Sequence, residues 1–309
     1  MFSIITPTYN RSGSNLLRQA LESIQSQQKG DFEWEHIVVN DGSSDDTKDF
    51  LDVYSKEHKG VVVVNQKNVG PASAIFNGVM ASSGDYILIL GDDDLLPPDS
   101  LLERAKYIEK NPSLDWFYAK AFWINEGGNR IPVEYQSQYF TDHMYERMLT
   151  GNIIHGGTLT VKRSVMQAIK KPEWLKRSED YFVSLELLRP ENNYKFGFLD
   201  KEIFCYRIHE SMYTKSYQGD EKKLAEKMEL NRKIKELHGE GLSFLAGEAG
   251  REKREREALE ELLKNEKLTV SNLEVRISAL ENENNAIKST YAWKIINRLE
   301  SAFRVDRSK

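Results

Sequence analysis

Four short β-rich runs recur in the first hundred residues of the chain, and each is followed by a polar turn. The runs span residues 2–6, 36–40, 61–65 and 85–90. The segments between them have the pattern of helices, and strands that alternate with helices predict βαβ units and a mostly parallel sheet. Ligands of such sheets bind beyond the carboxyl ends of the strands, so we expect the polar turns to lie together along one edge.

The fourth run ends in three consecutive aspartates, Asp92, Asp93 and Asp94. Adjacent like charges repel each other, so this acidic turn needs either a helix N-terminus or a bound cation beside it. A helix fits poorly, because Pro97 and Pro98 delay the start of the next one. Mg²⁺ is usually held by one or two carboxylates plus substrate phosphates, and Mn²⁺ prefers the same ligands. The residues alone favour a divalent metal site and leave a structural role open.

A second acidic turn, at residues 40–47, follows the second run. Ser43 or Ser44 can cap the helix that we expect to begin near Asp46, so part of this turn is structural. Asp41 is not needed for that purpose. Its carboxylate can accept a hydrogen bond from the N–H group of a nucleobase.

Four motifs, taken in order, resemble glycosyltransferase family 2. They read SIITPTYNR, VVNDGSSDDT, NVGPASAIFNGV and GDYILILGDDDLLPPDSL. The resemblance covers about residues 1–215 and implies an α/β domain with the GT-A fold, which is Rossmann-like and has a mostly parallel central sheet. It also implies an inverting enzyme that moves a sugar from a UDP- or dTDP-sugar to a hydroxyl group of a growing glycan. The expected product is a bacterial surface polysaccharide or a glycoprotein glycan, and the acceptor a glycan or a lipid-linked molecule.

The resemblance assigns roles around the nucleotide. Pro7 and Tyr9 match the turn that lines the nucleotide pocket, and Asp41 matches the acid that binds the base. Asp92 and Asp93 match the Asp-x-Asp-type element of the family. We expect Asp92 to contact the ribose and Asp93 to bind the metal, Mn²⁺ or Mg²⁺.

Two departures from the family pattern affect the nucleotide site. Gly91 stands where many members have the first acid of the element, and Ile75 and Phe76 stand where many carry an arginine and an asparagine. An arginine contact to the nucleotide is therefore missing, and we expect Arg11 or Lys67 to replace it.

Glycosyl transfer needs a general base, commonly a carboxylate, to activate the acceptor hydroxyl. Asp180 lies at the start of a predicted helix, and its Glu-Asp-aromatic context resembles the base motif of the family. We predict that Asp180 is the base and that Glu179 orients the acceptor or its loop. The structural alternative is that Ser178 caps the helix and the two acids favour its first turn.

The last predicted strand ends in Arg207, Ile208 and His209. This segment resembles an Arg-x-x-His-type element that the family places over the diphosphate, although it is one residue shorter. We predict that His209 contacts the metal and that Arg207 and Lys215 bind phosphate, with a purely structural histidine as the alternative. We place His155 at the border of the acceptor site.

The composition narrows the remaining possibilities. The net charge of −5 argues against bulk binding to nucleic acid. Cys205 is the single cysteine, so no intrachain disulfide forms, and we expect a buried structural thiol. The sequence shows no signal-peptide pattern and no apolar run of about 20 residues, which predicts a cytoplasmic protein.

The composition changes after the region of family resemblance, and helix-forming residues dominate from about residue 220. We divide the chain into a catalytic domain, a helical linker, a coiled coil and a basic amphipathic tail. These parts span residues 1–215, 216–250, 251–288 and 289–309. The coil predicts a homo-oligomer, because Leu263, Val270 and Ile277 recur at intervals of seven with a second series offset by three. A long solvated helix is the alternative.

The tail predicts a membrane contact. Trp293, Ile296 and Leu299 fall near one helical face, which basic residues border. Such a helix suits an anionic membrane surface, here the inner membrane face, whereas a coil cap or a self-association face is the alternative.

Two other functions remain as alternatives. One is a nucleotidyltransferase, which would be expected to open with a Gly-rich basic phosphate loop that TPTYNRSGSN lacks. The other is a coiled-coil scaffold that carries a degenerate transferase domain, which the missing arginine favours slightly.

Overall fold

The computed structural model describes residues 1–132, 143–210, 212, 221–243 and the single positions 278, 281, 282 and 285. Lys215, the tail and nearly all of the predicted coiled coil lie outside these residues. The chain divides into two compact units, Met1–Leu242 and Ser243–Lys309. In the part that the structure describes, no helix has the length and apolar character needed to span a bilayer.

The first unit is built on an eight-stranded sheet with the order β3-β2-β1-β4-β7-β5-β6, and β8 pairs with β5. The strands are β1 (Phe2–Thr8), β2 (Trp34–Asn40), β3 (Val61–Asn65), β4 (Tyr86–Ile89), β5 (Trp116–Asn125), β6 (Arg130–Ile131), β7 (Thr160–Lys162) and β8 (Phe196–Ile208). Strands β1 to β4 are mutually parallel, as are β5 and β8, whereas β7 runs antiparallel between β4 and β5. The predicted α/β fold with a mostly parallel sheet is confirmed.

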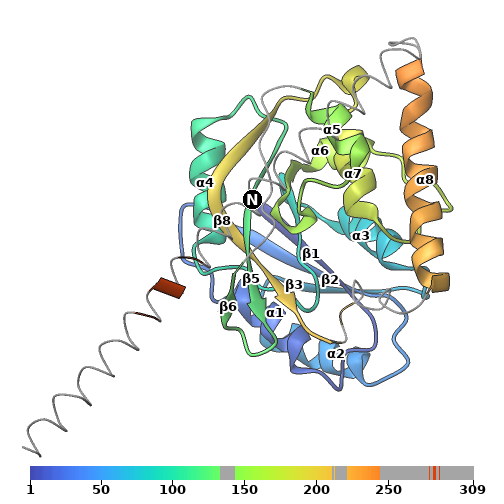
Figure 1. The fold of residues 1–309 in the computed structure, drawn as a ribbon. Coiled ribbons are helices and arrows are strands. Elements are labelled where there is room, and N and C mark those ends of the chain that lie inside the picture. Colours follow the sequence, from blue (N-terminus) through green and yellow to red (C-terminus); the bar gives the residue numbers. More distant parts are fainter. Residues whose placement is uncertain are drawn as a thin grey trace, which may run out of the picture. The chain divides into compact units, whose positions relative to one another are not determined.

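Helices flank the sheet in the first unit (Figure 1). They are α1 (Asn15–Gln25), α2 (Thr47–Glu57), α3 (Pro71–Ala81), α4 (Ser100–Lys110), α5 (Met144–Thr150), α6 (Arg163–Ala168), α7 (Glu179–Leu188) and α8 (Glu221–Ser243), with 3-10 turns η1 (Gly156–Thr158) and η2 (Pro190–Asn192). The Ser14 hydroxyl caps α1 by accepting the Leu16 N–H, and Pro71 opens α3 at a position where no N–H is needed.

Side chains alternate along β1 between two cores on opposite faces of the sheet. Ile5 packs with Ala72 of α3 in one core, and Ile4 packs with Ala20 of α1 in the other. Both isoleucines are fully buried. This alternation follows from the two-residue period of a strand, and it explains why β1 is apolar on both faces.

The carboxyl ends of the first three strands are level with one another. Thr8 pairs with Asn40, and Asn40 pairs with Asn65. The turns that follow are joined directly, because Asn10 N–H donates to the Ser43 hydroxyl at 3.0 Å. The expected clustering of these polar turns along one edge is therefore confirmed.

Helix α8 belongs almost entirely to the first unit and packs against its other helices, whereas we expected a helical linker at residues 216–250. Ile234 is fully buried, and His238 is 1% exposed. The His238 Nε2 atom lies 3.3 Å from a Glu186 carboxylate oxygen of α7, and its Nδ1 atom lies 3.2 Å from the Tyr145 hydroxyl of α5. These contacts hold α8 beside α5 and α7.

Strand β8 carries more residues than its partner. Ala119 of β5 pairs with Leu199, but the next residue, Lys120, pairs with Glu202, and Phe122 then pairs with Cys205. The surplus residues therefore lie in two irregularities in the middle of β8. Cys205 is buried, as predicted, and burial raises the pKa of its thiol to about 12.

A glycine on α3 allows the helix to approach the sheet closely. A Cβ atom at Gly78 would lie 2.5 Å from Ile5 Cγ2 and 3.2 Å from Val39 Cγ2. We expect Gly78→Val to lower the free energy of unfolding by about 1–3 kcal/mol, because the added carbons overpack a filled core. Urea denaturation measures the change. Gly13→Val is the matched control, since a Cβ there meets nothing within 4 Å. Equal losses in both variants would contradict the packing argument.

Candidate active site

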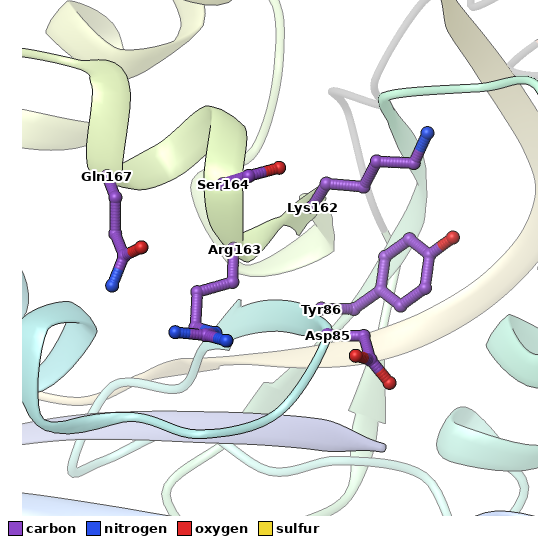
Figure 2. A pocket seen from close by; sticks show the side chains of 6 residues that line it. All are labelled: Asp85, Tyr86, Lys162, Arg163, Ser164 and Gln167. Atoms are coloured by element: carbon purple, nitrogen blue, oxygen red, sulfur yellow. The ribbon is translucent and has the colours of Figure 1, made fainter.

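The two ends of β4 differ in chemistry. A cavity of about 280 Å³ lies at the amino end, where Figure 2 shows Asp85, Tyr86, Lys162 and Arg163 among its lining residues. The acidic turn lies beyond the other end of the strand and takes no part in this cavity. A second cavity of about 200 Å³ is lined by Arg11 and the start of α1, on the same edge as the aspartates. The candidate site therefore lies at the carboxyl edge of the sheet.

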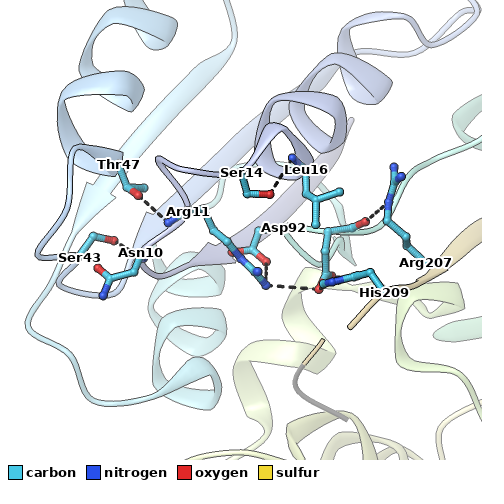
Figure 3. A network of polar contacts seen from close by, with 10 residues as sticks. Asn10, Arg11, Ser14, Leu16, Ser43, Thr47, Asp92, Arg207 and His209 are labelled. Atoms are coloured by element: carbon cyan, nitrogen blue, oxygen red, sulfur yellow. Dashed lines mark hydrogen bonds and ion pairs between the residues drawn. The ribbon is translucent and has the colours of Figure 1, made fainter. Parts of the chain in front are cut away.

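Three chain segments meet at the acidic turn (Figure 3). Arg11 follows β1, and its guanidinium contacts both oxygens of Asp92, at 3.0 Å from Nε and 2.9 Å from Nη2. The same Nη2 atom lies 3.3 Å from Asp93 Oδ2. His209 follows β8, and its Nε2 atom lies 3.1 Å from that Asp93 oxygen. The structure therefore brings together Arg11, Asp92, Asp93 and His209, four residues to which the sequence analysis assigned nucleotide- or metal-binding roles.

Burial makes the charge of the acidic turn costly. It raises the pKa of Asp92, and together with the charge of Asp93 it raises the pKa of Asp94 well above the usual value. Burial alone would lower the pKa of Arg11, but the carboxylates outweigh it and raise that pKa. The turn thus holds negative charge that a cation must balance, and Arg11 is that cation in this structure.

Arg207 requires a correction of its predicted role as a phosphate ligand. Its side chain is 1% exposed, and it donates to three oxygens inside the protein. These are the carbonyls of Asp93 and Glu126, each at 2.7 Å, and Gln19 Oε1 at 2.8 Å. The Arg207 N–H also donates to Asp94 Oδ1 at 2.8 Å. Arg207 therefore braces the acidic turn from inside the protein, and its buried guanidinium is not accessible to a phosphate.

The donor atoms at the acidic turn fit a divalent cation that is shared with a substrate. Among the described residues, no cluster of three or more His, Cys, Asp or Glu side chains could hold a metal by itself. Asp93 and His209 nevertheless offer an oxygen and a nitrogen donor in direct contact. Mg²⁺ commonly takes one or two protein ligands and completes its shell with substrate phosphates and water. The pair fits this class of site.

Asp41 holds the turn that leads into α3. Its Oδ1 atom accepts hydrogen bonds from Gln66 Nε2 at 2.7 Å and from Val69 N–H at 3.0 Å, and its Oδ2 atom accepts Gly70 N–H at 2.9 Å. Gly70 has a positive φ of 98° and touches the backbone of Lys176, where a Cβ would lie 2.7 Å from the carbonyl oxygen. Sequence reasoning missed Gln66, because no motif marks it.

The other predicted nucleotide contacts lie along the same edge. Pro7 is half-buried at the end of β1, and Tyr9 follows it with 46% of its surface exposed. Lys67 is exposed in the turn after β3. Among the described cations, Arg11 rather than Lys67 contacts the two aspartates.

A second carboxylate pair lies at the start of α7. Asn152 Nδ2 donates to Asp180 Oδ2 at 2.8 Å. Burial raises the pKa of Asp180, whereas the bond from Asn152 and the charge of Lys227 on α8 lower it. Burial and then the charge of Asp180 raise the pKa of Glu179 to about 7. Ser178 has a φ of +57° and its side chain makes no capping hydrogen bond, so that part of the structural alternative is wrong, although Glu179 and Asp180 do lie in the first turn of α7.

Sequence reasoning missed both Asn152 and Lys227 as neighbours of Asp180. Asn152 belongs to no recognised motif, and Lys227 lies on a helix that was expected to be a linker. The spacing of buried residues in α8 did contain a signal, because Leu230, Ile234 and His238 recur every four residues and pack against the rest of the first unit.

His155 lies beneath the turn that touches Asp180. Its ring packs between the rings of Phe204 and Tyr206, with centroids 5.0 and 4.8 Å away. Burial lowers the pKa of His155 to about 4, so the ring is neutral near pH 7. His155 directly precedes Gly156, which lies against Asp180, and its place at the border of an acceptor site stays a prediction.

Comparisons with known proteins show the family of the chain. The family model for Glycosyl transferase family 2 matches residues 3–170, which is more than half of the chain. An uncharacterized glycosyltransferase of Methanocaldococcus jannaschii is 27% identical over 213 residues, which cover 67% of this chain and 71% of the relative.

Solved structures share the fold. Staphylococcus aureus TarS 1-349 in complex with UDP-GlcNAc aligns with a TM-score of 0.56 at 22% identity, over 70% of this chain and 60% of TarS. A mannosyltransferase of Pyrobaculum calidifontis in complex with GDP-Man and Mn²⁺ aligns with a TM-score of 0.51 at 17% identity, over 69% of this chain and 58% of that one. The chain thus spans about three fifths of each solved neighbour. Because the family model matches more than half of its residues, the chain is an enzyme that belongs to glycosyl transferase family 2.

Proposed function

We propose that the protein is an inverting, metal-dependent glycosyltransferase whose donor is a UDP- or dTDP-sugar. The observation that carries this proposal is the contact between Asp93 and His209 at 3.1 Å, on the edge where Arg11 and the Asp41 turn also lie. That edge is where α/β sheets bind ligands. The UDP-GlcNAc complex of TarS supports a uridine donor.

The donor would lie across the turns after β1, β2 and β4. Tyr9, Pro7 and Asp41 face the base end, and Asp92 takes the ribose. Asp93 and His209 would hold Mn²⁺ or Mg²⁺, as the Mn²⁺ in the Pyrobaculum neighbour supports. The cation would supply Lewis-acid stabilisation of negative charge on the leaving diphosphate.

Arg11 would exchange its partners when the donor arrives. In this structure it balances Asp92 and Asp93. Diphosphate oxygens, like carboxylate oxygens, can accept bidentate, charge-assisted hydrogen bonds from a guanidinium. Arg11 is therefore the arginine that replaces the one missing from the third motif, and Lys67 lies further out on the same edge.

Asp180 would remove the proton from the acceptor hydroxyl as that oxygen attacks the anomeric carbon. Direct attack inverts the anomeric configuration. The Asn152 amide fixes the orientation of the Asp180 carboxylate, and burial keeps its pKa above that of a solvated aspartate, which makes it a better base. Glu179 orients the acceptor or its loop beside it.

The acceptor we propose is a hydroxyl of a growing bacterial glycan or of a lipid-linked precursor. Homo-oligomerisation through residues 251–288 and membrane contact through residues 289–309 stay predictions, as does Lys215 as a phosphate ligand. A degenerate scaffold is disfavoured, because the chain matches the glycosyltransferase family model and keeps the two carboxylates, Asp93 and Asp180, to which we assign catalytic roles.

The metal role of Asp93 predicts that Asp93→Ala abolishes Mn²⁺-dependent binding of UDP. For the unchanged chain, UDP and Mn²⁺ at 100 times the dissociation constant should stabilise the protein by about 2.7 kcal/mol. A thermal-shift titration measures this effect. Asp52→Ala, which removes an exposed carboxylate paired with Lys48 on α2, is the control and should bind as the unchanged chain does. Equal stabilisation of Asp93→Ala would refute the assignment.

Asp180→Asn should reduce kcat by about 10²- to 10⁴-fold and leave UDP binding intact, because only the proton acceptor is lost. The carboxylate form of Asp180 is the active one. Since burial raises its pKa, activity should fall with decreasing pH at a higher pH than a solvated aspartate would give. The pH profile of kcat/KM measures this fall. A flat acid limb in the unchanged chain would count against Asp180.

Arg11→Met should increase the affinity of the nucleotide-free protein for Mn²⁺ by about tenfold, or roughly 1.4 kcal/mol, because it removes a positive charge from the cation site. Isothermal titration calorimetry without nucleotide measures the affinity. Arg232→Met removes an exposed arginine of α8 and is the control. An unchanged affinity in Arg11→Met would show that Arg11 does not compete with the cation.

A further inference from the structure

Arg104, on α4, is a fully buried cation whose contacts are almost all with one short segment. Its Nη1 atom donates to the carbonyls of Thr158 and Leu159 at 3.1 and 3.3 Å and also to the Thr160 hydroxyl. Its Nη2 atom donates to the Gly157 carbonyl at 3.2 Å. Three successive carbonyls and the next side chain therefore converge on a single guanidinium.

The charge of Arg104 has no carboxylate counter-ion within ion-pair distance in the part of the chain that the structure describes. Burial lowers its pKa to about 9, which still leaves it charged near neutral pH. A buried charge that is held only by neutral dipoles is expensive, and a well-packed apolar residue of similar size often stabilises a core better. Fold stability alone therefore does not account for this residue.

The segment that Arg104 holds touches the proposed base. Gly156 begins η1, and a Cβ atom there would lie 2.6 Å from Asp180 Cβ. On the other side, a Cβ at Gly157 would lie 2.2 Å from the Phe204 ring. The turn is thus wedged between α7 and β8 with no space for a side chain. A shift of this turn moves the wall against which Asp180 rests.

We propose that Arg104 is a positioning residue that fixes the Gly156–Thr158 turn against Asp180 and so sets the geometry of the acceptor half of the site. This inference rests on the proposed function for its catalytic meaning. Two buried arginines then support different parts of the site. Arg207 braces the acidic turn, and Arg104 braces the turn beside the base.

Helix α4 connects the two halves. It begins just after the acidic turn and the two prolines, and its first residue, Ser100, donates to the Ile203 carbonyl of β8 at 2.7 Å. Arg104 lies one helical turn further along, where its Nε atom also contacts the Ser100 hydroxyl at 3.4 Å. Helix α4, which follows the acidic turn, therefore also holds the Gly156–Thr158 turn in position.

The test compares Arg104→Lys with Arg163→Lys. Lysine keeps the charge but cannot direct several donors at three carbonyls. Arg163 is the matched control, because it also donates to a main-chain carbonyl, that of Gly84 at 2.8 Å, at the far end of the sheet. We expect Arg104→Lys to lower kcat by about 10- to 100-fold with UDP affinity unchanged, because a small displacement of a catalytic group costs that much. Arg163→Lys should change neither quantity.

A second readout does not depend on activity. Asn152, Glu179 and Lys227 surround Asp180, and burial is the main cause of its raised pKa. A displaced turn admits water, so carboxyl NMR should show the pKa of Asp180 falling toward 3.8 in Arg104→Lys. Thr160→Val, which removes one acceptor of Arg104 at nearly constant volume, should give a smaller shift in the same direction and serves if Arg104→Lys does not fold.

The outcomes are separable. If the unchanged chain binds no sugar nucleotide, the proposed function fails, while the titration of Asp180 still decides the role of Arg104. The inference is overturned if the pKa of Asp180 in Arg104→Lys equals that in the unchanged chain. If Arg104→Lys does not fold, the same comparison is made with Thr160→Val. A loss of kcat in Arg104→Lys that is matched by Arg163→Lys, or that is accompanied by an equal loss of UDP affinity, also overturns the inference.

Discussion

Repulsion among three adjacent carboxylates is the constraint around which this site is organised. Asp92, Asp93 and Asp94 follow a buried strand, and burial weakens the screening that water would provide. The fold answers with Arg11 on the open side and with Arg207 N–H underneath. Charge balance therefore draws together the segments after β1, β4 and β8, which are far apart in the sequence.

The same balance separates two kinds of arginine. Arg11 is partly exposed, with 20% of its side chain open to solvent, and its partners are carboxylates that a cation can take over. Arg104 and Arg207 are buried, and their guanidinium groups bind mainly backbone carbonyls. A contact to a carboxylate can be exchanged when a ligand binds, whereas contacts to backbone carbonyls last as long as the fold does. The first kind suits ligand exchange, and the second suits rigid support.

Sequence reasoning predicted the parts of the site that depend on strand ends. The turn residues Asp41, Asp92 and Asp93 follow directly from where a parallel sheet places its carboxyl edge. It failed for Arg207, because the direction of a side chain near the end of a long strand depends on irregularities within that strand. It also missed Lys227, since only the tertiary packing of α8 brings that residue near Asp180. Local sequence patterns predict well where strands end. They do not predict which way a side chain points after a strand irregularity, or where a distant helix packs.

The irregular middle of β8 sets which way the end of that strand points. Between Leu199 and Ile208 the strand advances nine residues while β5, from Ala119 to Asn125, advances six. The surplus is odd, so it inverts the inside–outside alternation of β8 relative to its partner. Without it, Arg207 would exchange faces with its neighbours, and His209 would follow. The two surplus residues at Asp200 and Lys201 are even in number and leave the alternation unchanged, so the inversion comes from the single surplus residue between Glu202 and Cys205, where β8 advances three residues and β5 two. That short stretch, which contains the buried Ile203 and Phe204, therefore sets the parity of the strand end: a length change of two residues there would preserve the direction of the side chains beyond it, and a change of one would reverse it.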